Sequence, residues 1–137
     1  MIETWRWFGP EDKVTLSDIR QTGASGIVTS LYHLEPGMVW KKEEISSRLA
    51  EISGSKSHHT NLSWQVVESL PVSETIKTGV HPRDKHIKAW IESMENLSEL
   101  GIKVICYNFM PILDWTRTEL AAPMSSGATA MYFDLLD

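Results

Sequence analysis

The residues with the most evident chemistry follow an apolar run late in the chain. Residues 103 to 107 read as a buried strand, and Asn108, Asp114 and Arg117 come after it. Asn and Asp side chains can hydrogen-bond sugar hydroxyls, and an Arg guanidinium can bind a carboxylate through two parallel N–H donors. In α/β proteins such groups gather past the carboxyl ends of the strands. An equally weighted alternative for Asp114 and Arg117 is a mutual salt bridge that shapes the loop.

Earlier strand ends offer further candidates for the same pocket. Glu68 follows two valines, and a carboxylate there needs a cation, a hydrogen-bond donor, a metal ion or water, because burying an unpaired charge is costly. His33 and Trp7 also lie at predicted strand ends. Each has a structural alternative: Glu68 tied to an Arg or a backbone N–H, His33 as a satisfied structural group, and Trp7 in the core. The predicted substrate-binding residues are His33, Glu68, Asn108, Asp114, Trp7 and Arg117.

No general acid or base is assigned, and the histidine pairs of the chain do not predict a metal site. His58 and His59 are adjacent in a polar loop and therefore point apart, and His81 and His86 have no acidic or thiolate residue at ligand spacing. Cys106 lies in an apolar strand with no base near it in the sequence. We expect this thiol to be inert packing rather than a nucleophile.

Four apolar runs are predicted to be the strands that position these residues. They cover residues 5–9, 26–34, 63–70 and 102–109. The second and fourth runs are nearly continuously apolar, which is typical of parallel strands covered on both faces.

Helical patterns separate these strands. Residues 15–22 begin with a Thr-x-x-Asp capping pattern and are followed by a glycine. Residues 43–52 place Ile45, Leu49 and Ile52 on one stripe. Residues 83–100 repeat apolar side chains at three- and four-residue steps, with a glycine after the last one.

The predicted order, β-α-β-α-β-α-β, implies a parallel sheet with right-handed crossovers. Four strands and three helices are half of an eight-fold (β/α)8 TIM barrel, which requires roughly 250 residues. A doubly wound sheet has the same order, but no Gly-x-Gly-x-x-Gly turn follows the first strand, so a dinucleotide-binding form has no support. The predicted fold class is α/β, with residues 1–137 as the amino-terminal half of one TIM-barrel domain.

Two segments depart from this alternation. Residues 118–137 contain short apolar stretches around a Ser-Ser-Gly turn, which predicts a hairpin over the pocket mouth, and residues 53–61 are polar and predict a surface loop. No strand that would complete the sheet follows the fourth run, and an open sheet exposes two edges. We therefore expect the chain to be one segment of a longer protein.

Composition narrows the function classes. A hydrophobic fraction of 42% and a charged fraction of 23% are typical of a soluble globular protein. The net charge of −5 argues against a nucleic-acid partner, which usually requires a basic face. No stretch approaches the roughly 20 apolar residues of a membrane span, and the amino terminus lacks a secretory pattern. A single cysteine excludes an internal disulfide and predicts a cytoplasmic protein.

Three segments carry a family resemblance. CYNFMPILDWTRTEL, at residues 106–120, is very similar to the matching segment of mannonate dehydratases. TWRWFGPEDKVTLSDIRQTGASGIVTSLYHL, at 4–34, resembles the amino terminus of that family, and VVESLPVSETIKTG, at 66–79, a third family segment. The segments keep their order and cover almost the whole chain, although family members are much longer. Where the family usually has two histidines, this chain has Tyr32 and His33, which weakens any inherited role for Tyr32.

The resemblance implies a metal-dependent hydro-lyase. Mannonate dehydratases convert D-mannonate to 2-keto-3-deoxy-D-gluconate in hexuronate catabolism, with Mn²⁺ or Fe²⁺ as cofactor. The family's metal ligands come from later strands, and no residue of this chain matches them. The resemblance therefore implies that the isolated chain lacks the metal site and is inactive. The expected partner is the sugar acid D-mannonate, and a homo-oligomer is left open.

Two other readings stay open. One is a metal-dependent sugar isomerase or epimerase on a similar barrel, since barrels host many reactions. An aldonate needs a cation for its carboxylate and a ketose does not, so Arg6 and Arg117 both pointing away from the pocket would favour the isomerase. The other is a non-enzymatic half-barrel that binds a partner through its open edges.

Overall fold

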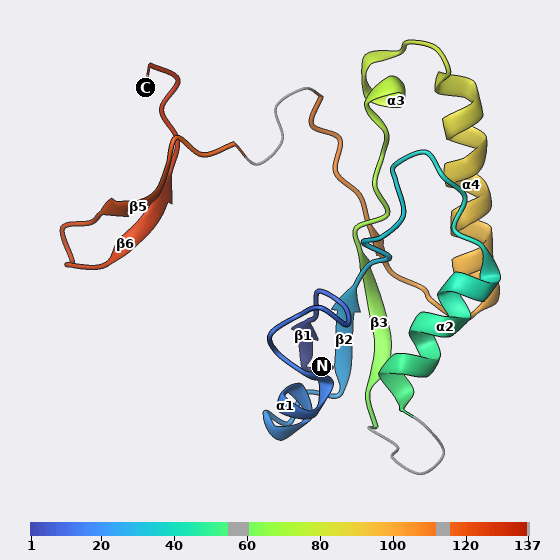
Figure 1. Ribbon diagram of the computed structural model, residues 1–137, viewed down its shortest axis with the longest axis horizontal. Coiled ribbons are helices and arrows are strands. Elements are labelled where there is room, and N and C mark those ends of the chain that lie inside the picture. Colours follow the sequence, from blue (N-terminus) through green and yellow to red (C-terminus); the bar gives the residue numbers. More distant parts are fainter. Residues whose placement is uncertain (55–60, 112–115, 137) are drawn as a thin grey trace.

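The computed structural model describes residues 1–54, 61–111 and 116–136 (Figure 1). The elements, in chain order, are β1 (Thr4–Arg6), α1 (Leu16–Gln21), β2 (Gly26–Thr29), α2 (Lys42–Ser53), β3 (Ser63–Glu68), α3 (Glu74–Thr78), α4 (Arg83–Glu99), β4 (Ile105–Cys106), β5 (Glu119–Pro123) and β6 (Thr129–Tyr132). The predicted alternation is present, and α3 is a short helix that the sequence did not predict.

The first four strands form one parallel sheet in the order β1-β2-β3-β4. Arg6 pairs with Val28 and Val67 pairs with Ile105, so all four strands end at the same edge. This confirms the predicted parallel α/β sheet. The strands are shorter than predicted, and β2 ends before residues 30–34, where the chain turns.

Local signals in the sequence set the helix ends. Thr15 and Asp18 form the predicted capping box at the start of α1, each side chain bonding the other residue's backbone N–H. At the end of α4, Gly101 takes a left-handed conformation with φ 88°. This lets the N–H of Ile102 reach the carbonyl of Leu97 at 3.0 Å, which closes the helix.

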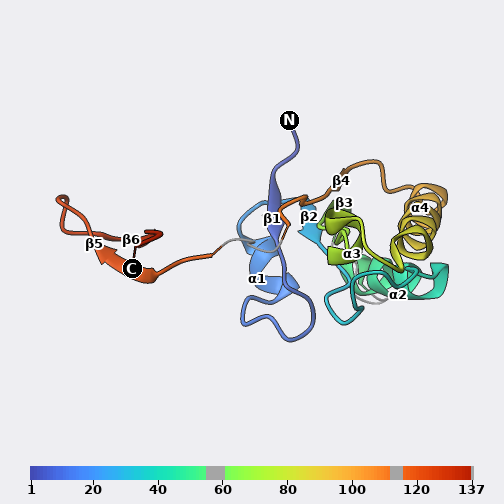
Figure 2. The ribbon, with the colours of Figure 1, turned by 90° about the horizontal axis from the view of Figure 1, so that it is seen from above.

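The core lies between the sheet and the helices. α2 contacts both β3 and α4, and α2 and α4 lie side by side in Figures 1 and 2. Ile27, Trp64 and Val67 of the strands are buried, as are Ile45 and Ile52 of α2. The predicted stripe of the second helix is therefore confirmed.

The predicted apolar face of α4 packs against the core, although Ile91 on that face is exposed. The buried residues of α4 are Ala89, Ser93 and Leu97. A polar side chain at position 93 does not look like a core residue in the sequence. It is buried because its hydroxyl donates to the carbonyl of Ala89 at 2.7 Å.

The fourth strand is not covered on both faces as predicted. Val104, Tyr107 and Phe109 are exposed. Cys106 is exposed as well, so its predicted place in the packed interior is wrong, whereas its inertness stays a prediction. The physical reason is its place at the edge of the sheet, where β4 pairs only with β3.

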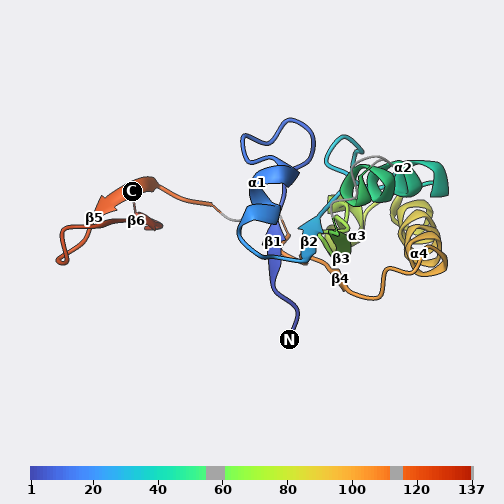
Figure 3. The same cartoon turned by 90° about the horizontal axis from the view of Figure 1, so that it is seen from below.

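The end of the chain forms a separate two-stranded sheet, in which β5 and β6 pair antiparallel. Figures 1 and 3 show this hairpin apart from the parallel sheet, and most of its side chains are exposed. The structure does not place it over the pocket mouth as expected. Among the helices of the described residues, none has the length and apolar character needed to cross a bilayer.

Candidate functional site

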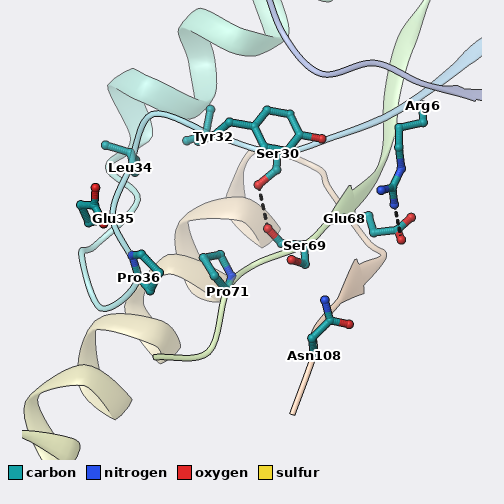
Figure 4. A pocket seen from close by; sticks show the side chains of 11 residues that line it. Arg6, Ser30, Tyr32, Leu34, Glu35, Pro36, Glu68, Ser69, Pro71 and Asn108 are labelled. Carbon is teal, nitrogen blue, oxygen red and sulfur yellow. Dashed lines mark hydrogen bonds and ion pairs between the residues drawn. The ribbon is translucent and has the colours of Figure 1, made fainter. Parts of the chain in front are cut away.

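A cavity of about 570 Å³ lies at the carboxyl ends of the four parallel strands (Figure 4). Arg6 ends β1, Tyr32 follows β2, Glu68 ends β3 and Asn108 follows β4, and all four line this cavity. The sheet therefore brings one polar side chain from every strand to one place. In TIM barrels this end of the strands carries the active site.

An ion pair lies on one side of this cavity. Nη2 of Arg6 pairs with Oε1 of Glu68, although β2 separates their two strands. The Glu68 carboxylate raises the pKa of Arg6, chiefly through this hydrogen bond. The side chains are 41% and 43% exposed, and pairs of this exposure are worth about 0 to 1 kcal/mol. The pair therefore positions charge in the cavity more than it stabilises the fold.

The segment after β2 supplies the neighbouring wall. The Ser30 hydroxyl donates to the carbonyl of Ser69 at 2.7 Å, which ties the ends of β2 and β3 together. Tyr32 packs against Phe8, with ring centroids 5.8 Å apart, and burial raises the pKa of its phenol. Tyr32 therefore stays protonated at neutral pH and can donate a hydrogen bond into the cavity.

Comparison with known proteins agrees with this geometry. The family model described as "D-mannonate dehydratase (UxuA)" matches residues 1–136. The chain belongs to the mannonate dehydratase family. This confirms the family that the three sequence segments indicated.

The chain resembles two curated mannonate dehydratases. It is 51% identical to the enzyme of Chromohalobacter salexigens, over 98% of this chain and 33% of that protein. It is 49% identical to the enzyme of Rhizobium meliloti, over 100% of this chain and 33% of that protein. The chain thus spans about a third of the length of these relatives.

A solved structure shows the same arrangement. The crystal structure of mannonate dehydratase from Streptococcus suis serotype 2 matches with a TM-score of 0.84 and 39% sequence identity. The match covers 96% of this chain and 36% of that one. The predicted fold class is confirmed: four parallel strands and their helices correspond to part of a TIM-barrel-like mannonate dehydratase.

Two predicted site residues of this family member lie away from the cavity. Nε2 of His33 pairs with Glu44 at 3.0 Å, and both line a separate cavity of about 490 Å³. His33 is in the turn beyond β2 rather than at the strand end. Trp7 is 5% exposed and belongs to the core, with its ring 5.2 Å from the guanidinium carbon of Arg48. The core alternative fits Trp7, and substrate binding by either residue stays a prediction.

The segment after β4 is only partly described. Asp114 lies outside the described residues, so the salt bridge between Asp114 and Arg117 stays a prediction. His58 and His59 also lie outside the described residues. Arg117 is half-buried, and its Nη1 donates to the carbonyl of Thr116 at 2.7 Å. It does not line the cavity that holds Glu68 and Asn108.

The described residues of this mannonate dehydratase family member do not fit a metal centre. Among them, no three His, Cys, Asp or Glu side chains gather in one place. Glu35 and Glu68 are the carboxylates among the described residues that line the cavity, and Arg6 already engages Glu68. No chemical step is therefore assigned to a metal ion held by these residues.

Sequence reasoning missed several residues that line the cavity. Arg6, Ser30, Tyr32 and Ser69 all lie at or just past a strand end. Their place after an apolar run could have indicated this, but the predicted strands extend further along the chain than the observed ones. The predicted Glu68 and Asn108 were found because β3 and β4 do end beside them.

Proposed function

We propose that this chain forms one wall of the substrate pocket of a mannonate dehydratase. The proposal rests on one observation: in a member of this family, Arg6, Glu68 and Asn108 meet in a cavity at the carboxyl ends of the strands. The substrate is D-mannonate, and the product is 2-keto-3-deoxy-D-gluconate.

The reaction removes one water molecule from the sugar acid. The C–H bond beside the carboxylate breaks and the hydroxyl of the next carbon leaves, which gives an enol that tautomerises to the keto acid. A general base must take the carbon-bound proton, and a general acid must protonate the leaving hydroxyl. We assign neither role to this chain.

The role proposed for this chain is binding and orientation. The amide of Asn108 can accept hydrogen bonds from sugar hydroxyls and donate to them, and the carboxylate of Glu68 holds Arg6 beside it. The phenol of Tyr32 adds a donor beside them. Glu68 ends β3 and Asn108 follows β4 closely, which holds their spacing better than a long loop would, and Tyr32 lies in the turn after β2.

The family reaction uses Mn²⁺ or Fe²⁺, which would act as a Lewis acid on substrate oxygens. The described residues offer no ligand set for such an ion, so we place its ligands on the part of the relatives that this chain does not match. A cytoplasmic location fits a chain whose one cysteine is a free thiol.

The condition that would favour a sugar isomerase is not met. An isomerase was favoured if both Arg6 and Arg117 pointed away from the pocket, and Arg6 lines the cavity. An aldonate substrate, which needs a cation beside its carboxylate, is therefore the better fit.

A segment exchange tests the proposal. Residues 1–136 replace the matching third of the Chromohalobacter salexigens relative, and formation of the keto acid from D-mannonate is followed. We expect turnover of the same order as the parent enzyme. A folded, metal-loaded chimera without turnover would contradict the proposed function.

The 137-residue chain serves as the comparison in the same assay. We expect it to show neither bound metal nor turnover above background, because its described residues hold no ligand set. Clear turnover by this chain alone would contradict the assignment of one pocket wall.

A further inference from the structure

The charges around the cavity are unevenly placed. Among the described residues that line it, Arg6 is the one cation, and Glu35 and Glu68 are the carboxylates. Figure 4 shows Arg6 and Glu68 together on one side and Glu35 across the cavity from them. Among these residues, Arg6 is therefore the group that can attract the carboxylate of a sugar acid.

Contacts on two sides hold the guanidinium of Arg6. Nη2 pairs with Glu68, and the guanidinium carbon lies 5.7 Å from the centroid of the Phe8 ring. A guanidinium carries five N–H donors in a planar fork, and the ion pair engages one edge of it. The side chain is 41% exposed and lines the cavity.

We propose that Arg6 binds the carboxylate of the sugar acid and that Glu68 holds the guanidinium in place for it. This inference rests on the proposed function and names the specificity residue of that site. The substrate carboxylate lies at the Arg6 side, and the hydroxyl groups of the remaining carbons extend toward Glu35, whose carboxylate accepts hydrogen bonds from them. A neutral polyol, which lacks the anionic group, gains nothing from Arg6.

The alternative is an ion pair that only joins two strand ends, and the two partners separate these readings. If the pair is purely structural, removing either charge has the same effect on ligand binding. If Arg6 is the carboxylate receptor, removing Arg6 abolishes carboxylate binding. The Glu68→Gln side chain keeps an oxygen that can accept from the guanidinium and so still positions Arg6, but it removes the competing negative charge, so carboxylate binding stays intact or becomes stronger.

The test uses the full 137-residue chain and NMR titration of the side-chain N–H signals of Arg6 and Asn108. The probes are D-mannonate, D-mannitol as the neutral polyol, and acetate as a bare carboxylate. We expect D-mannonate to shift both signals, acetate to shift that of Arg6, and D-mannitol to leave Arg6 unchanged. A chain that shows no response to D-mannonate overturns the inference.

Three variants distinguish the two readings by whether the affinity for D-mannonate falls or rises. Arg6→Met is expected to weaken D-mannonate binding by on the order of tenfold or more, the usual effect of losing a charged hydrogen-bond partner. Arg6→Lys keeps the charge but loses the fork and should fall in between. Glu68→Gln is expected to bind about as tightly as the wild type or up to about fivefold tighter.

Amide NMR spectra of each variant show whether it is folded. If Arg6→Met does not fold, binding by Glu68→Gln still tests the inference. Equal binding by wild type and Arg6→Met, or equal losses in Arg6→Met and Glu68→Gln, overturns the inference. The chimera of the previous section separates this failure from failure of the function. Turnover there with no effect of Arg6→Met on KM removes only the role of Arg6, whereas an inactive chimera removes both.

Discussion

Arg6 and Glu68 join the carboxyl ends of β1 and β3 across the end of β2. The two strands are not neighbours in the sheet, so no backbone hydrogen bond links them. The side-chain pair spans the intervening strand and faces the cavity. This is where a parallel sheet can bring together residues that lie 62 positions apart in the sequence.

The first prediction concerns the energy of this pair. Because both partners are about two-fifths exposed, Arg6→Met and Glu68→Gln should each lower the free energy of unfolding by no more than about 1 kcal/mol. The pKa of Arg6 is raised, so its contribution is present below the ordinary Arg pKa and is lost only at more alkaline pH. Urea unfolding at neutral pH, at low and high salt, measures the effect. A loss of several kcal/mol that salt does not reduce would contradict it.

The second prediction compares two glycines. Gly9 and Gly23 both have left-handed backbones, with φ 95° and 89°. A Cβ on Gly9 would lie 2.9 Å from Nη1 of Arg48, which is buried beneath Trp7, whereas a Cβ on Gly23 would meet no atom within 4 Å. We expect Gly23→Ala to cost about 1 to 2 kcal/mol from backbone strain alone, and Gly9→Ala to cost more.

Urea unfolding of the two glycine variants measures this difference. Arg48→Met supplies the control, because it removes the guanidinium that the new methyl group meets. In the Arg48→Met background, Gly9→Ala should lose its excess cost over Gly23→Ala. Equal costs for the two glycines in the wild-type background would show that Arg48 moves aside freely.

Much of the fold follows from local patterns in the sequence. The capping pair Thr15 and Asp18 fixes the start of α1, and Gly101 fixes the end of α4. The burial of Arg48 was not predicted, because a charged side chain is not expected in the core. Its spacing from Ile45 and Ile52 nevertheless puts it on the buried face of α2. The sequence shows this stripe, but it does not show that the Arg48 guanidinium is covered by Trp7, which follows β1 far away in the chain.

The candidate site was predictable only where strand ends were placed correctly. Glu68 was found because β3 does end there. The first strand was read as extending to residue 9, which put Trp7 at its end and hid Arg6; β1 ends at Arg6. His33 was misplaced because β2 ends at Thr29. Successive strand residues point to opposite faces, so a small error in an end changes which side chain meets the cavity.

The third prediction is a pH effect at the start of α1. Hydrogen bonds from the side chain and then the backbone of Thr15 lower the pKa of Asp18. A lowered carboxyl pKa stabilises the fold above the unfolded-state value and loses that contribution as pH falls through the folded value. Thr15→Ala should therefore raise the pKa of Asp18 toward its ordinary value, and Thr15→Ser, which keeps the hydroxyl, should not. Carboxyl ¹³C NMR titration measures both, and an unchanged pKa in Thr15→Ala would contradict the assignment.

The fourth prediction concerns the accessibility of the Cys106 thiol. Its side chain is exposed on the edge strand β4, so the thiol is open to solvent. Iodoacetamide should alkylate it in the folded chain at a rate close to that of the urea-unfolded chain. Mass spectrometry follows the modification, and Cys106→Ser gives the blank. Strong protection in the folded chain would show that Cys106 is covered.

The last prediction concerns the segment that leads from the cavity into α2. Trp40 is buried, and its backbone N–H donates to the Ser93 hydroxyl of α4 at 2.9 Å. Its carbonyl accepts from Asn96 of the same helix at 2.9 Å. α4 therefore satisfies both backbone groups of a residue with no strand partner of its own.

Ser93→Ala leaves the buried N–H of Trp40 without its acceptor, which should lower the free energy of unfolding by about 1 to 3 kcal/mol. Ser98→Ala, on the exposed face of α4, is the matched control and should change stability little, because Ala favours the helix. Urea unfolding gives both values, and amide hydrogen exchange at Trp40 should speed up in Ser93→Ala alone. Equal effects of the two substitutions would mean that α4 does not hold this segment through Ser93.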